Sequence, residues 1–191
     1  DRDPIELFSE WYGAAEEAGI FMPESTALAT ANADGTPSVR MILLKKWDER
    51  GFVFFTNYDS RKALELDENP TASLLLYWGV LERQVRIEGS VERISEEESL
   101  EYFRTRSRGS QVGAWASKQS DVLESKDALA ARVKARSDEF GGGDVPLPPF
   151  WGGYRVTPTR IEFWQGRANR LHDRLVFARA EPGWTTERLY P

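Results

Sequence analysis

The spacing of apolar and polar residues predicts a helix at the start of the chain. Apolar side chains recur at helical spacing over residues 3–19. Asp3 is placed as an N-cap before Pro4, a residue that suits the first helical position, and Gly19 is typical of a helix end. We therefore expect an amphipathic N-terminal helix that packs one face on the rest of the fold.

Strand-like segments follow as far as residue 94, at 26–31, 38–46, 52–56, 71–78 and 84–94. Asp34-Gly35 is typical of a hairpin turn between the first two. A short helix is predicted to begin at Ser60, whose hydroxyl is placed to cap it, and to end before Asn69-Pro70. Closely spaced strands with few helices between them favour a small β-barrel over a doubly wound sheet.

Further helices are expected beside this barrel. The residues at 95–98 form a capping box that opens a helix through Phe103, and a second helix with an apolar side is predicted over 126–140. Glycines and prolines make a loop over 141–149, and strands then resume at Tyr154, Ile161 and Leu175. The prediction is a mainly β protein with flanking helices, one domain over residues 1–191, with its C-terminal segment at about 150–191.

Composition excludes several classes of function. No apolar run approaches the ~20 residues that span a bilayer, and the start of the chain does not read as a signal peptide, so we expect a cytoplasmic protein with no membrane partner. A net charge of −6 argues against nucleic acid as a partner. With no cysteine and one histidine, neither thiol chemistry nor a metal site is expected.

Local basic clusters in this acidic chain indicate a small anionic ligand. Arg61 and Lys62 fall in the first turn of a predicted helix, where free N–H groups and cations together suit a phosphate; a surface pair is the competing interpretation. Arg40 and Lys45 lie five apart, so they face opposite sides of an ideal strand and converge only if it bends.

Two more clusters occur later in the chain. Residues 104–110 combine three arginines with hydroxyls after a predicted helix end, although cations there also complement the helix dipole. Residues 167–174 surround His172, the only histidine, with arginines, and a structural role for that histidine stays open. The G-x-G-x-x-G, G-x-x-x-x-G-K-[ST] and G-x-S-x-G motifs are absent from the sequence, so these residues alone predict phosphate ligands but no reaction.

Five longer stretches carry a resemblance to a known family. They read RMILLKKWDERGFVFFTNYDSRKA, LERQVRIEGSVERIS, SRGSQVGAWASKQS, PPFWGGYRV and IEFWQGRANRLHDRL. Together, in this order, they resemble the pyridoxine (pyridoxamine) 5′-phosphate oxidase family from about Asp3 to the C-terminus. The resemblance implies an FMN-binding split β-barrel and a homodimer with FMN at the subunit interface. It also implies oxidation of pyridoxine or pyridoxamine 5′-phosphate to pyridoxal 5′-phosphate, with oxygen as acceptor and hydrogen peroxide released.

The same resemblance assigns residues to the two ligands. Those expected to contact FMN are Arg40, Met41, Ile42, Leu43, Leu44, Lys45, Phe55, Thr56, Arg61, Lys62, Gln84, Gln119, Ser120, Trp164 and Arg174. Those expected to contact the substrate are Lys45, Tyr102, Arg106, Ser110, Arg170, Leu171 and His172. Arg170 and His172 are the expected catalytic pair over the pyridine ring. The alternatives are a related FMN-dependent oxidoreductase on the same barrel and a non-catalytic carrier of flavin or pyridoxal phosphate.

Overall fold

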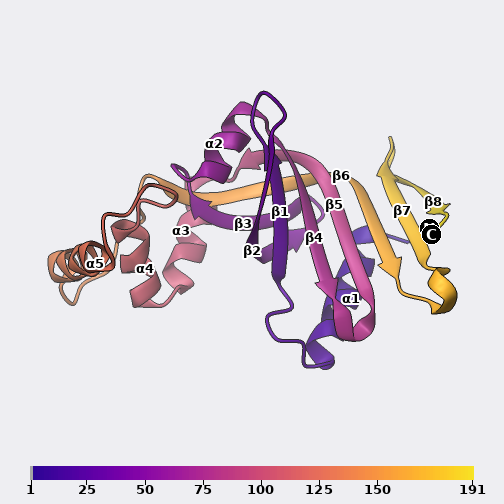
Figure 1. Ribbon diagram of the computed structural model, residues 1–191, viewed down its shortest axis with the longest axis horizontal. Coiled ribbons are helices and arrows are strands. Elements are labelled where there is room, and N and C mark those ends of the chain that lie inside the picture. The colour runs from indigo at the N-terminus through magenta and orange to yellow at the C-terminus, as the bar shows by residue number, and fades with distance from the viewer. Residues whose placement is uncertain (1) are drawn as a thin grey trace.

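The structure, a computed structural model, describes residues 2–191, and in that part of the chain eight antiparallel strands form one sheet (Figure 1). The strands of the barrel are β1 (Ser25–Ala31), β2 (Pro37–Asp48), β3 (Gly51–Asn57), β4 (Thr71–Trp78), β5 (Arg83–Arg93) and β6 (Trp151–Gln165). Their order is β3-β2-β1-β4-β5-β6, and a further pairing of β3 with β6 closes the barrel. The prediction of a mainly β barrel with flanking helices is confirmed.

Alternation along the strands fills the barrel with apolar side chains. In β1 and β4 every second residue is buried, so Leu28, Leu74 and Leu76 point inward while their neighbours face out. The helix α1 (Pro4–Glu17), capped by the Asp3 carboxylate, adds Phe8 to this core. Phe8 packs edge-on against Phe52 at 5.0 Å between ring centroids, so the N-terminal helix is tied to the barrel by aromatic packing.

The barrel opens on one side because β2 and β3 pair over only part of their length. Their register runs from Leu44 to Asp48 of β2 and is irregular between Leu44 and Lys46. The first half of β2 pairs with β1 alone, so its other edge is unpaired among residues 2–191. This free edge and the helix α2 (Arg61–Glu68) border the opening, where backbone N–H and C=O groups can receive a ligand.

Three helices lie at one end of the molecule, drawn on the left in Figure 1: α3 (Glu96–Thr105), α4 (Arg108–Ala116) and α5 (Lys126–Phe140). Phe103, Val112 and Trp151 form a second, smaller core that holds α3 and α4 to β6. At the other end the strands β7 (Asp173–Arg179) and β8 (Trp184–Leu189) extend the sheet beyond β6.

Three local expectations need correction. The helix α4 was not predicted, although Ser107 caps it by accepting the N–H of Ser110. Ser60 is the N-cap residue of α2, but its hydroxyl makes no cap bond and accepts a hydrogen bond from Lys62 instead. No residue of α5 is fully buried: on its expected apolar side Leu129 is half-buried and Val133 is 37% exposed, so that side is only partly covered by the described part of the chain.

Within residues 2–191, none of the helices has both the length and the apolar character required to cross a membrane.

Candidate functional site

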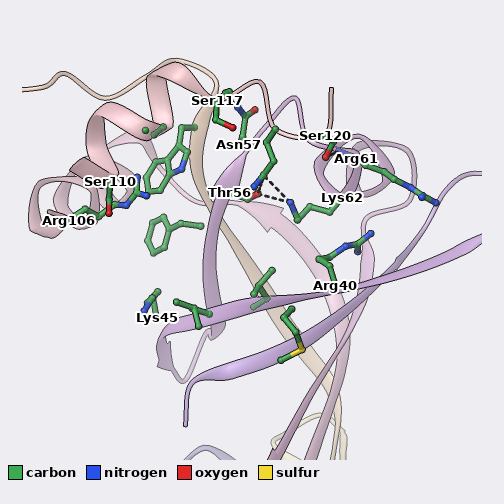
Figure 2. A pocket seen from close by; sticks show the side chains of 18 of the residues that line it. Arg40, Lys45, Thr56, Asn57, Arg61, Lys62, Arg106, Ser110, Ser117 and Ser120 are labelled. Atoms are coloured by element: carbon green, nitrogen blue, oxygen red, sulfur yellow. Dashed lines mark hydrogen bonds between the residues drawn. The ribbon is translucent and has the colours of Figure 1, made fainter. Parts of the chain in front are cut away.

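A cavity of about 850 Å³ lies at the opening of the barrel, between the free edge of β2, the strand β3 and the helices α2, α3 and α4 (Figure 2). Fourteen of the residues expected to contact a ligand line it, and we call them the cavity group: Arg40, Met41, Ile42, Leu43, Lys45, Phe55, Thr56, Arg61, Lys62, Tyr102, Arg106, Ser110, Gln119 and Ser120. Residues up to 80 positions apart in the sequence thus meet around one space.

One corner of the cavity is built around Lys62, whose side chain is only 8% exposed. Its ammonium donates to Thr56 Oγ1 at 3.1 Å (Figure 2), and also to Ser60 Oγ at 3.2 Å and Gln119 Oε1 at 3.0 Å. Burial, with the charge of Arg40 as a smaller cause, lowers the pKa of Lys62 to about 8. Lys62 is therefore a cation held in place by neutral acceptors. The nearby Glu65 carboxylate raises the pKa of Lys62, but by less than burial and Arg40 lower it.

The start of α2 completes this corner. The backbone N–H of Arg61, which heads the helix, donates to Ser120 Oγ at 3.1 Å. Ser120 has a φ of 80°, a left-handed conformation that is costly for a serine and that fits a functional constraint. A helix N-terminus, a buried ammonium and Arg40 on β2 together make a site for an anion.

The opposite corner is built around Arg106, which ends α3 (Figure 2). Its guanidinium lies 4.7 Å from the ring centroid of Trp151, and burial lowers its pKa. The Nη1 atom is buried and has no hydrogen-bond partner among the described residues. A buried donor without an acceptor is costly, so this nitrogen fits a ligand that brings oxygen atoms.

Tyr102 and Lys45 lie close to Arg106 in the cavity wall. The Tyr102 ring stacks on Phe55 at 4.0 Å, and burial raises the pKa of its hydroxyl. Lys45 lies at the irregular register of β2 and pairs with Glu24 at 3.5 Å. That irregularity explains why Arg40 and Lys45 both line the cavity, although an ideal strand would turn them to opposite faces.

The three arginines of the cluster predicted at 104–110 do not all face the cavity. Arg106 lines the cavity, whereas Arg108 donates to the carbonyl oxygens of Gly141 and Gly143. Arg104 is exposed on α3. Only one of the three guanidiniums therefore faces the candidate site.

The remaining expected residues do not line the cavity. Leu44 is 1% exposed and belongs to the barrel core. Gln84, Trp164 and Arg174 are direct neighbours across β5, β6 and β7, and we call them the cross-strand row. Arg170, Leu171 and His172 lie beside that row in the connection before β7, which contains a short helical turn, η2 (Ala168–Arg170). In Figure 1 this region is at the opposite end of the longest axis from α3 and α4.

The surroundings of His172 give it a defined orientation. Its ring lies 4.5 Å from that of Trp164, and its Nδ1 accepts the backbone N–H of Arg167 at 3.2 Å. A neutral imidazole with Nδ1 as acceptor carries its proton on Nε2. Asn169 and Arg170 have φ values of 57° and 62°, so the turn before His172 holds two residues in a costly conformation.

Some residues of the site escaped the sequence analysis. Asn57, Ser117 and Trp151 line the cavity, and Glu65 contacts Arg40 and Arg61. The position of Glu65, four residues after Arg61 on a predicted helix, was the available signal. Trp151 lay within a recognised stretch but had no assigned role.

Comparisons with known proteins agree on one family. The family model described as pyridoxamine 5′-phosphate oxidase matches residues 15–138, and one described as the pyridoxine 5′-phosphate oxidase C-terminal dimerisation region matches residues 151–191. A pyridoxine/pyridoxamine 5′-phosphate oxidase of Rubrobacter xylanophilus is 59% identical over 191 residues, 100% of this chain and 88% of that protein. One of Psychromonas ingrahamii is 56% identical over 190 residues, covering 100% and 88%.

Solved structures give the same fold. PhzG from Burkholderia lata 383, in complex with tetrahydrophenazine-1-carboxylic acid, matches with a TM-score of 0.95 and 37% identity over 100% of this chain and 94% of that one. A pyridoxamine 5′-phosphate oxidase-related, FMN-binding protein from Nostoc punctiforme PCC 73102 matches with a TM-score of 0.79 and 17% identity over 100% of both chains. The second likeness supports the fold alone.

Proposed function

This chain belongs to the pyridoxamine 5′-phosphate oxidase family, and from that premise we propose that it oxidises pyridoxine or pyridoxamine 5′-phosphate to pyridoxal 5′-phosphate. The acceptor is oxygen, which leaves as hydrogen peroxide, and the amine substrate also takes up water and releases ammonia. The observation that carries the proposal is a single cavity with cations at two separate corners (Figure 2). Two corners suit two phosphorylated ligands, a flavin mononucleotide and a phosphorylated substrate.

The corner around Lys62 fits the phosphate of FMN. The ammonium of Lys62, the start of α2 at Arg61 and the guanidinium of Arg40 converge there, with Ser120 beside them. The free edge of β2 offers backbone groups, and Phe55 and Thr56 line the cavity from β3. When bound, FMN supplies the acceptor for the hydride that leaves the C4′ carbon of the substrate.

The corner around Arg106 fits the phosphate of the substrate. Arg106 has a buried nitrogen without a partner, and a phosphate oxygen is a strong acceptor for it. Ser110 adds a hydroxyl, Tyr102 a phenol and Lys45 a second cation. These residues bind and orient the substrate in the cavity, and this positioning is the larger part of what the chain contributes to the reaction.

We propose that a second copy of the chain supplies the cross-strand row and the segment at Arg170–His172. Both belong to the chain's expected ligand contacts but lie apart from its own cavity. Val39 and Met41, on the part of β2 that borders the cavity, and Tyr77 on β4 leave large side chains exposed, which suits a covered interface. The proposal keeps residues 1–191 as one domain, whose segment from about residue 150 onward adds dimer and active-site contacts to those of these exposed side chains.

Within that dimer, Arg170 and His172 of one chain face the substrate held by the cavity of the other. His172 presents an Nε2–H donor while its Nδ1 is occupied by the N–H of Arg167. Arg170 adds a permanent positive charge beside the pyridine ring. Gln84, Trp164 and Arg174 complete the flavin contacts, and Glu162 holds Arg174 in place at 2.7 Å.

The direct test is to add pyridoxamine 5′-phosphate to the FMN-loaded protein without oxygen and to follow the flavin absorbance. We expect the absorbance to bleach as pyridoxal 5′-phosphate forms in equal amount to the flavin, and to recover after air is admitted. A flavin that stays oxidised would contradict the proposed substrate. Failure to bind added FMN would contradict the cofactor as well.

The second candidate substrate is a reduced phenazine carboxylic acid. The likeness to PhzG in its complex with tetrahydrophenazine-1-carboxylic acid favours it, because that match covers the whole chain. Arg106, Lys45 and Ser110 favour the phosphate substrate, since a dianion makes use of two cations and a monocarboxylate needs only one. The same anaerobic assay with tetrahydrophenazine-1-carboxylic acid distinguishes the two classes.

A further inference from the structure

We propose that Glu65 is a positioning residue for the phosphate of the flavin, because it holds Arg40 and Arg61 in the arrangement that receives that phosphate. This inference rests on the proposed function, since it assigns the same cavity to a phosphorylated flavin. It adds an acidic residue to a site otherwise made of cations and hydroxyls.

Glu65 joins two elements that border the cavity. It lies on α2, is 6% exposed, and accepts the Nε–H of Arg61 at 2.8 Å through one carboxylate oxygen. Its other oxygen accepts from a guanidinium nitrogen of Arg40 on β2 at 3.1 Å. The two arginines come from different elements, so the carboxylate sets their relative position.

The carboxylate oxygen that faces Arg40 is held in turn by two hydroxyl groups. Ser38 donates its hydroxyl to the same oxygen as Arg40 at 2.6 Å, and the hydroxyl of Thr30 also donates there. Burial on its own would raise the pKa of Glu65, but the hydrogen bonds from two hydroxyls and two guanidiniums outweigh it and lower the pKa to about 2. Glu65 therefore stays ionised at any pH at which the enzyme works.

The charges of this corner match a phosphate monoester. Arg40, Arg61 and Lys62 bring three positive charges, and Glu65 removes one. The remaining two balance a dianionic phosphate. Without Glu65 the long side chain of Arg61, which is 63% exposed, would have no partner among the described residues to hold it beside the cavity.

The matched substitutions are Glu65→Gln and Asp67→Asn. The glutamine keeps the size of the side chain but offers one acceptor oxygen, so it cannot hold both arginines. Asp67 is on the same helix and pairs with Arg93 at 2.8 Å, away from the cavity-lining residues. Each protein is stripped of flavin and titrated with FMN and with riboflavin, which lacks the phosphate, and both dissociation constants are measured.

We expect Glu65→Gln to raise the Kd for FMN about tenfold, the effect of one charge-assisted hydrogen bond, and to leave the Kd for riboflavin unchanged. Asp67→Asn should change neither. In the Arg61→Ala background, Glu65→Gln should have a smaller effect, because one of the two arginines that Glu65 positions is already absent. If Glu65→Gln fails to fold, Glu65→Asp, which keeps the charge and shortens the reach, should still weaken FMN and spare riboflavin.

Other outcomes overturn the inference. Unchanged or tighter FMN binding in Glu65→Gln would mean that the carboxylate does not position the arginines, or repels the phosphate more than it helps. An equal loss of FMN and riboflavin would mean a merely structural role. A wild-type chain that binds no FMN would overturn the proposed function and this inference with it. If the wild type binds FMN and Glu65→Gln leaves the ratio of the Kd for FMN to the Kd for riboflavin unchanged, this inference alone is overturned.

Discussion

Lys62 is a buried cation whose charge depends on pH within the working range of an enzyme. Burial, with Arg40, lowers its pKa to about 8 in the ligand-free chain, so the ammonium loses its proton as the pH rises through that value. A phosphate binds the protonated form, so FMN affinity should be greatest below pH 8 and fall above it. Titrations with FMN between pH 7 and 9, where the phosphate stays dianionic, measure this directly.

The control for Lys62 is Lys62→Arg, because a guanidinium keeps its charge throughout this range. We expect its FMN affinity to be nearly independent of pH between 7 and 9. The same fall in the variant as in the wild type would assign the pH dependence to another group.

Arg106 provides a test of the substrate corner. Arg106→Ala removes the buried guanidinium whose Nη1 lacks a partner, so KM for pyridoxamine 5′-phosphate should rise more than kcat falls. Arg104→Ala, on the exposed side of α3, should leave both constants unchanged. Steady-state kinetics measure both, and an unchanged KM in Arg106→Ala would remove this residue from the phosphate site.

His172 is expected to act on the substrate and not on flavin retention. His172→Ala should keep bound FMN, because the phosphate corner of the cavity is untouched, and lose much of kcat/KM. Proton handling by a positioned side chain typically contributes ~10²–10⁴-fold, which sets the size of the loss. Flavin content and kcat/KM are measured together; normal turnover would refute the catalytic role of His172.

Individual residues differ in how far their place could be predicted. Arg61 and Lys62 at a helix start gave a physical reason for a phosphate site, and the structure has both at one corner of the cavity. The spacing of Glu65 from Arg61 signalled one ion pair, but the contact of Glu65 with Arg40 and the missing acceptor of Arg106 had no signal, because each depends on the three-dimensional fold. The side chain of Ser60 was misjudged, since a buried lysine competes for its hydroxyl.

Among the elements, the close approach of β5 and β6 depends on Gly89. A Cβ built there would lie 2.0 Å from the backbone oxygen of Thr157, at a point where the register of the two strands shifts. Gly89→Ala should therefore lower the free energy of unfolding by ~1–3 kcal/mol. Denaturant unfolding measures it.

Gly109→Ala is the matched control in α4, where nothing lies within 4 Å of the added carbon. A helical alanine should leave stability unchanged or raise it by ~0.5–1 kcal/mol. Equal destabilisation by both substitutions would show that the contact at Thr157 is not the cause.

Most elements could be predicted because their signals are local. Alternating burial marks β1 and β4, and caps mark the starts of α1 and α3. The helix α4 was missed because it is short, contains two glycines and follows another helix almost directly. The irregular register of β2, which brings Arg40 and Lys45 to one cavity, arises from pairing with β3 and leaves no local mark in the sequence.

For the whole molecule, strand spacing predicted the barrel and the family resemblance implied FMN at a subunit interface, but the sequence did not indicate which site residues fall into which of the two separate regions. The cavity group and the cross-strand row lie toward different ends of the molecule, and only the complete fold reveals this (Figure 1). The sequence pattern of one chain does not indicate which ligand contacts a second copy of the chain supplies. The central claim is therefore that two chains share each oxidase site.

The measurement that tests this claim is the activity of a mixed dimer. Arg106→Ala and His172→Ala chains, each with a different tag, are co-expressed and the mixed species is purified. One of its two sites then has an intact cavity and an intact His172, so kcat/KM per dimer should return to about half the wild-type value. A mixed dimer of Arg106→Ala with Lys62→Ala, both in the cavity group, should not recover. A first mixed dimer no more active than its parents would contradict the account.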